Sequence, residues 1–299
     1  MVIFRKGLLL LCFLCAHQAF ASEGNSLTLY FYHSPRKLNW KSPGQLTRSV
    51  VASVALDELN GHDGIALGHV SVEVKCSDSW RFHSGMTQSN PTESMGLLLG
   101  KRIGLGILFH SFKGRFETEK EVEDRLKKKK IKYNYVDFSI SNSTCLRLKE
   151  YIEVFKEEKL DKYYGLSLDP RKREGAGCAP FAISFLELIG VLSPETSHPD
   201  LREEIESNWM KTLVIPQRYL SDPENNRKVS FLKLLMGKTN WELGKSDAGR
   251  ELSFGDPNSM FSWVKENANE TRTIYNRQIE GVKIDLSKLS TPLEPIFRK

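Results

Sequence analysis

The chain has 299 residues, a formal net charge of +6 at neutral pH and an apolar content of 40%. This composition is ordinary for a globular protein and can supply the core of one large domain, or of one domain with an extension. The charge is too small to indicate a nucleic-acid-binding protein, although a mildly basic surface suits an anionic cell envelope. The densest basic run, residues 127–130, is interpreted as the solvated end of a helix.

Residues 1–21 have the pattern of a cleaved secretory signal peptide. Arg5 and Lys6 form a short positive region, residues 7–16 are apolar, and Ala19-Phe20-Ala21 places small residues where a signal peptidase reads them. The apolar run is too short to cross a bilayer as a helix. We therefore expect cleavage after this tripeptide and a secreted or periplasmic protein with no later transmembrane segment. A retained anchor is the alternative.

Three cysteines follow the signal, namely Cys76, Cys145 and Cys178. An odd number in an exported protein leaves at least one thiol without an intramolecular partner. We predict a Cys76–Cys145 disulfide, because both residues lie beside predicted elements and export permits oxidation. This pairing leaves Cys178 free, whereas the rival pairing of Cys145 with Cys178 would abolish any chemistry of that thiol.

Short strands and helices alternate along the chain up to about residue 220. Aromatic content and period-two alternation predict strands, whereas helical spacing and turn residues predict helices. In chain order, the predicted elements are a strand 27–32, a helix 45–59, a strand 69–74, its hairpin partner 80–83, a strand 103–112, a helix 117–130, a strand 131–140, a helix 144–160, a loop 163–177, helices 179–189 and 200–209, and an extended segment 212–220.

Beyond residue 221 the pattern weakens, and polar residues separate isolated aromatics such as Trp241, Phe254 and Trp263. We expect residues 22–220 to form the main domain and residues 221–299 a loosely organised C-terminal extension. The aromatics are interpreted as a small satellite core or as a contact surface. Short strands, many of them antiparallel, with helices on both sides predict an α+β architecture.

The strongest chemical signal is the glycine-rich turn at residues 175–177, which delivers Cys178 to the start of an apolar helix. Unpaired N–H groups at a helix start stabilise a thiolate and lower its pKa, and they could also serve as oxyanion donors. His69, at the entry to a strand, is the candidate general base and acid. His83 is the candidate that orients His69, because a hairpin would bring it alongside, and His110 is its rival.

This arrangement resembles the circularly permuted papain-like hydrolases of the NlpC superfamily, the group that includes lecithin:retinol acyltransferase-like proteins. The residues that carry the resemblance are Gly68-His69-Val70 on an early strand, Tyr164-Gly165-Leu166 before the cysteine loop, and the helix that follows Cys178. The resemblance implies a permuted papain-like core, in which a small antiparallel sheet packs on helices. The chain differs from many members at Gly177, where they carry a polar residue.

We therefore expect an exported cysteine hydrolase or acyltransferase that acts on an amide or ester, with Cys178, His69 and His83 as its site. Cell-wall peptides are the first substrate class and lipid esters the second. No cofactor or metal is expected, because no histidine pair has zinc-ligand spacing and no nucleotide-binding motif is present. The alternative is a non-catalytic secreted binding domain of the same fold, which contacts an envelope component or a partner protein.

Overall fold

The structure is a computed structural model that describes residues 24–61, 64–90, 92–193, 198–237, 241 and 248–299. The predicted signal peptide lies outside the described residues. Within the described part of the chain, no helix combines the length and the apolar character needed to cross a bilayer.

An eight-stranded sheet forms the centre of the molecule, with strand order β6-β4-β3-β2-β1-β5-β10-β9. Neighbouring strands run antiparallel, except that β10 pairs with β5 in parallel. A separate antiparallel pair is formed by β7 and β8. The strands are β1 (Ser26–Tyr32), β2 (His69–Lys75), β3 (Arg81–Gln88), β4 (Phe112–Phe116), β5 (Tyr133–Ile140), β6 (Tyr163–Tyr164), β7 (Met210–Pro216), β8 (Gly249–Gly255), β9 (Glu270–Ile274) and β10 (Arg277–Leu286).

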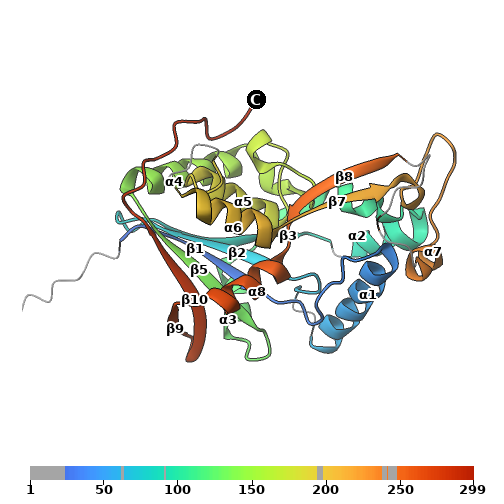
Figure 1. Ribbon diagram of the computed structural model, residues 1–299, viewed down its shortest axis with the longest axis horizontal. Coiled ribbons are helices and arrows are strands. Elements are labelled where there is room, and N and C mark those ends of the chain that lie inside the picture. The colour runs from blue at the N-terminus through green and yellow to red at the C-terminus, as the bar shows by residue number, and fades with distance from the viewer. Residues whose placement is uncertain (1–23, 62–63, 91, 194–197, 238–240, 242–247) are drawn as a thin grey trace, which may run out of the picture.

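Helices cover both faces of the large sheet, as alternation along the strands requires (Figure 1). In β1, Leu27, Leu29 and Phe31 face the main core, whereas Tyr30 and Tyr32 face a smaller tyrosine-rich core. Helices α4, α5, α6 and α8 pack on the first face and α3 on the second. The helices are α1 (Pro43–Leu59), α2 (Thr92–Met95), α3 (Glu119–Lys127), α4 (Asn142–Glu157), α5 (Cys178–Leu188), α6 (Pro199–Trp209), α7 (Phe231–Met236) and α8 (Pro257–Asn267).

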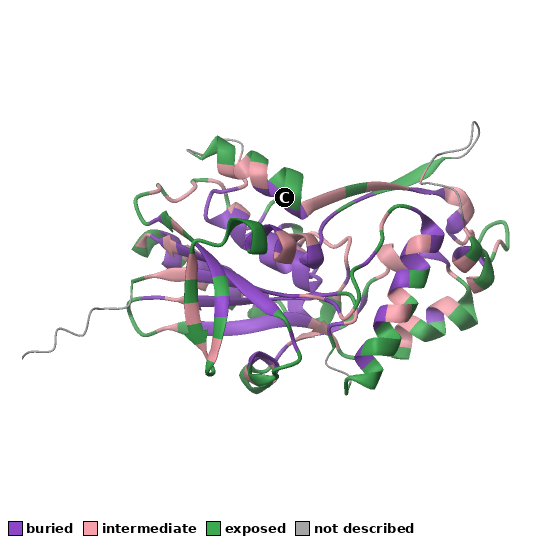
Figure 2. Cartoon of the chain, turned by 60° about the horizontal axis from the view of Figure 1, so that its bottom comes forward, coloured by how far each residue is buried: buried purple, intermediate pink, exposed green. Residues whose placement is uncertain are grey.

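A smaller lobe lies at one end of the molecule, where β7 and β8 extend toward α1 and α7 (Figure 1). Its own apolar cluster joins Leu46 of α1 to Ile215, Tyr219 and Leu234. Figure 2 shows that buried residues concentrate on the large sheet, whereas α1 keeps a largely exposed outer face. The large sheet therefore carries most of the buried core.

The predicted α+β class is confirmed, but one predicted strand is wrong. Residues 103–112 do not form a strand, because Leu105–Phe109 adopts a short 3-10 helix and β4 begins only at Phe112. Gly104 has a positive φ of 63°, which breaks an extended run at this point. Leu105 then packs into the small lobe, so its apolar character reflects a different core.

The segment after residue 221 is more ordered than its composition suggests. β10 pairs with β5 over six residues and continues the large sheet. Trp263 of α8 is only 5% exposed in the main core, and Phe254 of β8 is 3% exposed, so neither side chain offers a contact surface. Trp241 is half-buried against the small lobe. The sequence shows no strong pattern for β10 because its partner β5 lies more than a hundred positions earlier.

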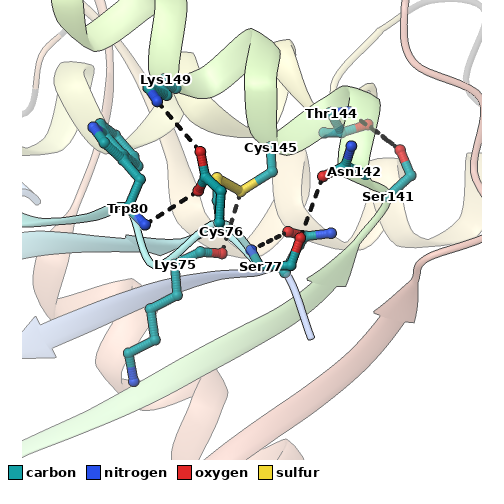
Figure 3. Close-up of a disulfide and its surroundings, with 11 residues drawn as sticks. Lys75, Cys76, Ser77, Trp80, Ser141, Asn142, Thr144, Cys145 and Lys149 are labelled. Carbon is teal, nitrogen blue, oxygen red and sulfur yellow. Dashed lines mark hydrogen bonds and ion pairs between the residues drawn. A yellow bond between two sulfur atoms is a disulfide. The ribbon is translucent and has the colours of Figure 1, made fainter. Parts of the chain in front are cut away.

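The predicted disulfide between Cys76 and Cys145 is confirmed, with a Cα–Cα distance of 5.8 Å (Figure 3). It joins the end of β2 to the first turn of α4, which lies across the sheet. Lys149 of α4 also reaches Asp78 in the turn after β2, at 3.4 Å. Cys178 remains a free, buried thiol, so the rival Cys145–Cys178 pairing is wrong.

Replacing both Cys76 and Cys145 by Ser should lower the free energy of unfolding by about 4 kcal/mol. The bridge closes a loop of 69 residues, and its removal returns conformational freedom to the unfolded chain. Urea unfolding of the oxidised protein and the double variant measures the difference. An unchanged unfolding midpoint would contradict a stabilising role.

Candidate functional site

Cys178 is the first residue of α5 and follows a loop whose glycines pack closely against residues 163 and 165. Gly175 has a φ of +91°, and a Cβ there would meet Tyr163 Cβ at 2.5 Å. A Cβ at Gly177, the N-cap, would meet the Gly165 carbonyl oxygen at 2.9 Å. Because the helix begins at Cys178, the N–H groups of Cys178 and Ala179 have no acceptor within the helix. These N–H groups bring partial positive charge to the sulfur.

His69 begins β2 directly after a tight turn. Gly68 has a φ of +80°, and its N–H bonds to the Ile65 carbonyl at 2.8 Å. A Cβ at this glycine would meet Pro257 Cβ at 3.0 Å, so α8 packs closely against the turn. His69 pairs with Tyr32 of β1, and their rings lie 5.8 Å apart. The turn and the neighbouring strand together fix the position of the imidazole.

The sheet opens between β2 and β3 where the cysteine approaches. Pairing of these strands ends at Ser71 and Gly85, and β3 then continues beside β4 from Met86. Val70 therefore lies one residue past the last pair. By strand alternation its N–H faces the β3 side. This N–H donates a hydrogen bond to the Cys178 sulfur. The sulfur also makes a hydrogen bond with the His69 side chain. The thiol thus occupies a gap in the ladder.

Glu117 completes a chain of buried charges behind His69. Its Oε2 atom lies 2.8 Å from His69 Nε2 and 3.0 Å from Arg125 Nη1, while Arg125 Nη2 donates to Oε1. Glu117 directly follows β4, and its backbone N–H donates to the Gly85 carbonyl at 2.8 Å. Since Nε2 is held by Glu117, Nδ1 is the ring nitrogen left for the sulfur. The order Cys178, His69, Glu117 is that of a nucleophile, a base and an orienting group.

Electrostatics favour the charged forms of all three groups. Burial lowers the pKa of His69, but the Glu117 carboxylate outweighs burial and raises it to about 9. Burial raises the pKa of Glu117, yet His69 and Arg125 together bring it well below its usual range. Burial likewise raises the pKa of the Cys178 thiol, and the hydrogen bond and charge of His69 reverse this into a net lowering. The arrangement therefore shifts the thiol toward the thiolate and the imidazole toward the imidazolium.

The Tyr164 hydroxyl is a further polar group at the sulfur, with which it makes a hydrogen bond. Burial and the neighbouring Cys178 raise the pKa of Tyr164, so the phenol keeps its proton and can donate. Tyr164 belongs to β6, which pairs with β4 through Phe112. The sequence placed this tyrosine in a motif but did not indicate its contact with the thiol.

His83 does not take the position expected of it. The hairpin forms, but its register sets His83 opposite Glu73, and His69 lies beyond the last β2–β3 pair. The His83 ring instead lies 5.4 Å from the Tyr30 ring. The rival candidate, His110, packs its ring against Phe112 at 4.8 Å. Glu117 is the group bonded to His69, which corrects the expectation for both histidines.

Sequence pattern does not reveal Glu117 and Arg125, because both fall within the charged surface helix predicted at residues 117–130. The sequence does contain a signal for Glu117, namely the capping box of Thr118 and Glu121, which starts α3 at Glu119. Glu117 therefore lies outside the helix, at the end of a strand. Arg125 carries no comparable signal, because only the tertiary fold buries it to 9% exposure.

No family model, curated protein or solved structure matches the chain. Within the described residues, no three His, Cys, Asp or Glu side chains are grouped so that they could hold a metal ion. The site consists of a thiol, an imidazole, a carboxylate and a phenol.

Replacing Glu117 by Gln should lower the pKa of His69 from about 9 to below its ordinary 6.5, because burial is then the dominant influence. In the native protein the folded pKa exceeds the unfolded one, so His69 contributes stability that is present below pH 6.5 and lost as the pH rises through 9. An NMR titration of the His69 ring measures the shift. Glu119→Gln, at a side chain that is 58% exposed, is the matched control. An unchanged His69 pKa in Glu117→Gln would contradict the charge chain.

Replacing Gly85 by Ala should disrupt the His69–Glu117 pair without touching either residue. The added Cβ would lie 2.5 Å from Glu117 Oε2 and 2.8 Å from His69 Nε2, so one of them must move. We expect the alkylation rate of Cys178 at neutral pH to fall about tenfold or more as the thiolate loses its partner. Gly100→Ala, where no atom lies within 4 Å of the new Cβ, should leave that rate unchanged.

Proposed function

We propose that this protein is a thiol-dependent hydrolase or acyltransferase whose nucleophile is Cys178. The observation that carries the proposal is the buried chain from the Cys178 sulfur through His69 to Glu117. A free thiol at a helix start, bonded to an imidazole that is itself held by a carboxylate, is the arrangement used for nucleophilic catalysis. A thiol buried only for packing requires neither the imidazole nor the carboxylate.

In the proposed reaction, the thiolate attacks the carbonyl carbon of an amide or ester. The developing oxyanion lies against the N–H groups at the start of α5, with the Tyr164 hydroxyl as a further donor. His69 gives its proton to the leaving amine or alcohol, and the acyl group stays on the sulfur as a thioester. A water molecule or an acceptor alcohol or amine then loses its proton to His69 and attacks the thioester, which releases the thiolate.

The first proposed substrate class is peptide amides and the second is lipid esters. We further propose that the protein is exported and belongs to the permuted papain-like group. The order of elements supports this assignment, with the histidine at the start of an early strand and the cysteine at the start of a late buried helix. The Cys76–Cys145 disulfide supports an oxidising compartment, where such bridges persist. Secretion or a periplasmic location therefore belongs to the same proposal.

One observation favours the second candidate, a non-catalytic binding domain of the same fold. Cys178 is only 9% exposed and His69 only 3%, so the reacting atoms have little access to solvent in this conformation. A binding domain would need a different contact surface from Phe254 and Trp263, because both are buried. The reactivity of the thiol decides between the two candidates.

Iodoacetamide should alkylate Cys178 of the native protein at pH values well below 8.5, because His69 lowers the pKa of the thiol. Peptide mapping after labelling across a pH series gives the rate at this residue. The urea-unfolded protein is the control, and its labelling should follow an ordinary thiol pKa of about 8.5. Cys178→Ala should lose the label and any acyl-transfer activity while its melting temperature stays close to that of the native protein.

A native thiol that resists alkylation over the whole pH range, together with a Cys178→Ala variant that unfolds, would make the residue structural. That result would favour the binding domain. Alkylation that tracks the unfolded control would also contradict an activated thiolate.

A further inference from the structure

A hollow of about 430 Å³ lies beside β3, and apart from Glu117 the proposed reaction uses none of the residues that line it. The volume falls within the range of ligand sites. Arg81, Glu119 and Lys156 form its exposed rim. The buried or partly buried floor consists of Phe82, His83, Ser84, Phe116 and Glu117.

The hollow lies where β3 has a neighbour on one side only. Its partner β2 pairs with Arg81 through Gly85, whereas β4 pairs only from Met86 onward. After Glu117 the chain turns into α3, whose Glu119 pairs with Arg81, and among the described residues no strand pairs with residues 81–84 on this side. A short stretch of open strand edge therefore faces the hollow.

The ladder determines which backbone groups this edge offers. The Cys76 N–H bonds to the Trp80 carbonyl, so by alternation Phe82 and Ser84 direct their N–H and C=O groups toward β2. Arg81 and His83 must then direct theirs outward. Gly85 confirms the alternation, because its outward carbonyl accepts the Glu117 N–H at 2.8 Å. An extended peptide can pair with this open edge.

His83 adds a buried donor at the same place. The residue is 8% exposed, and its Nε2 atom has no hydrogen-bond partner. Arg81 Nη2 lies 3.5 Å from His83 Nδ1, and a guanidinium only donates, so Nδ1 accepts and the neutral ring carries its proton on Nε2. Leaving a buried donor unpaired is costly, which points to an acceptor that a ligand supplies.

We infer that the open edge of β3 at Arg81 and His83 binds an extended peptide segment of the substrate, which pairs with the outward backbone groups and accepts from His83 Nε2. This inference rests on the proposed function. The position fits, because Glu117 both lines the hollow and holds His69. On one side of the edge lies the partly buried ring of Phe116, with Lys156 above it and above the buried ring of Phe82. On the other side, Arg81 and Glu119 are polar, so an alternating apolar and polar peptide suits the edge.

Amide hydrogen exchange tests the inference on the Cys178→Ser variant, which removes any turnover. The probe is the blocked peptide acetyl-Leu-Ser-Leu-Ser-amide. At saturating peptide, the amides of Arg81 and His83 should exchange at least about tenfold more slowly. The exchange rates of the Phe82 and Ser84 amides, which are already bonded to β2, should not change. The same peptide with N-methylated central amides should not protect them.

His83→Phe should weaken peptide binding several-fold, because it removes the Nε2 donor while keeping a ring of similar shape. His110→Phe, at a ring that packs against Phe112, is the control and should bind normally. Unchanged exchange at Arg81 and His83 would overturn the inference, as would equal binding of the N-methylated peptide. Protection that appears without peptide and disappears on dilution would assign the edge to a second copy of the chain, which also overturns it.

The two proposals fail separately. Activated alkylation of Cys178 without peptide protection would leave the thiol chemistry standing and remove the β3 site. Peptide protection in a protein whose thiol is inert would support peptide binding at β3 but end its connection to catalysis.

Discussion

The buried carboxylate of Glu117 is the group on which the site depends. A charge removed from water is tolerated only if partners replace its hydration, and Glu117 has Arg125 on one side and His69 on the other. These three residues come from the end of β4, from α3 and from the start of β2. One ion cluster therefore fixes the relative positions of three segments, and the thiol at the start of α5 completes the arrangement. Removing Glu117 would leave the buried guanidinium of Arg125 without its carboxylate partner.

The backbone prepares the space that this cluster fills. β3 separates from β2 after Gly85, which frees the Val70 N–H for the sulfur. Gly85 itself must lack a side chain, because the His69 and Glu117 side chains occupy the position of its Cβ. The ion cluster thus fits only because the sheet opens here and because Gly85 has no side chain. The same divergence of strands produces the open edge of β3 farther along.

Local pattern was enough to single out Cys178 and His69, which the fold brings together, but not the residues that support them. Cys178 and His69 both stand at the junction of a glycine turn with a regular element, which is a local feature that a sequence displays. Glu117 and Arg125 resemble ordinary surface charges, because their burial results from packing between distant segments. His83 was placed by the correct idea of a hairpin, but register depends on which residues face the core, and that shifts it away from His69. For the same reason β10 was not predicted, since its partner β5 is remote in sequence.

The position of β10 has a consequence for how the chain reaches its final form. β5 lies between β1 and β10, so its second edge stays uncovered until residues 277–286 arrive beside it. Near the chain's end, the carbonyls of Pro295 and Ile296 accept hydrogen bonds from Arg171, a fully buried side chain. The guanidinium finds these acceptors only when residues 295 and 296 lie beside it. The native contacts of β5 and of Arg171 are therefore complete only after segments more than a hundred positions later in the chain have taken their places.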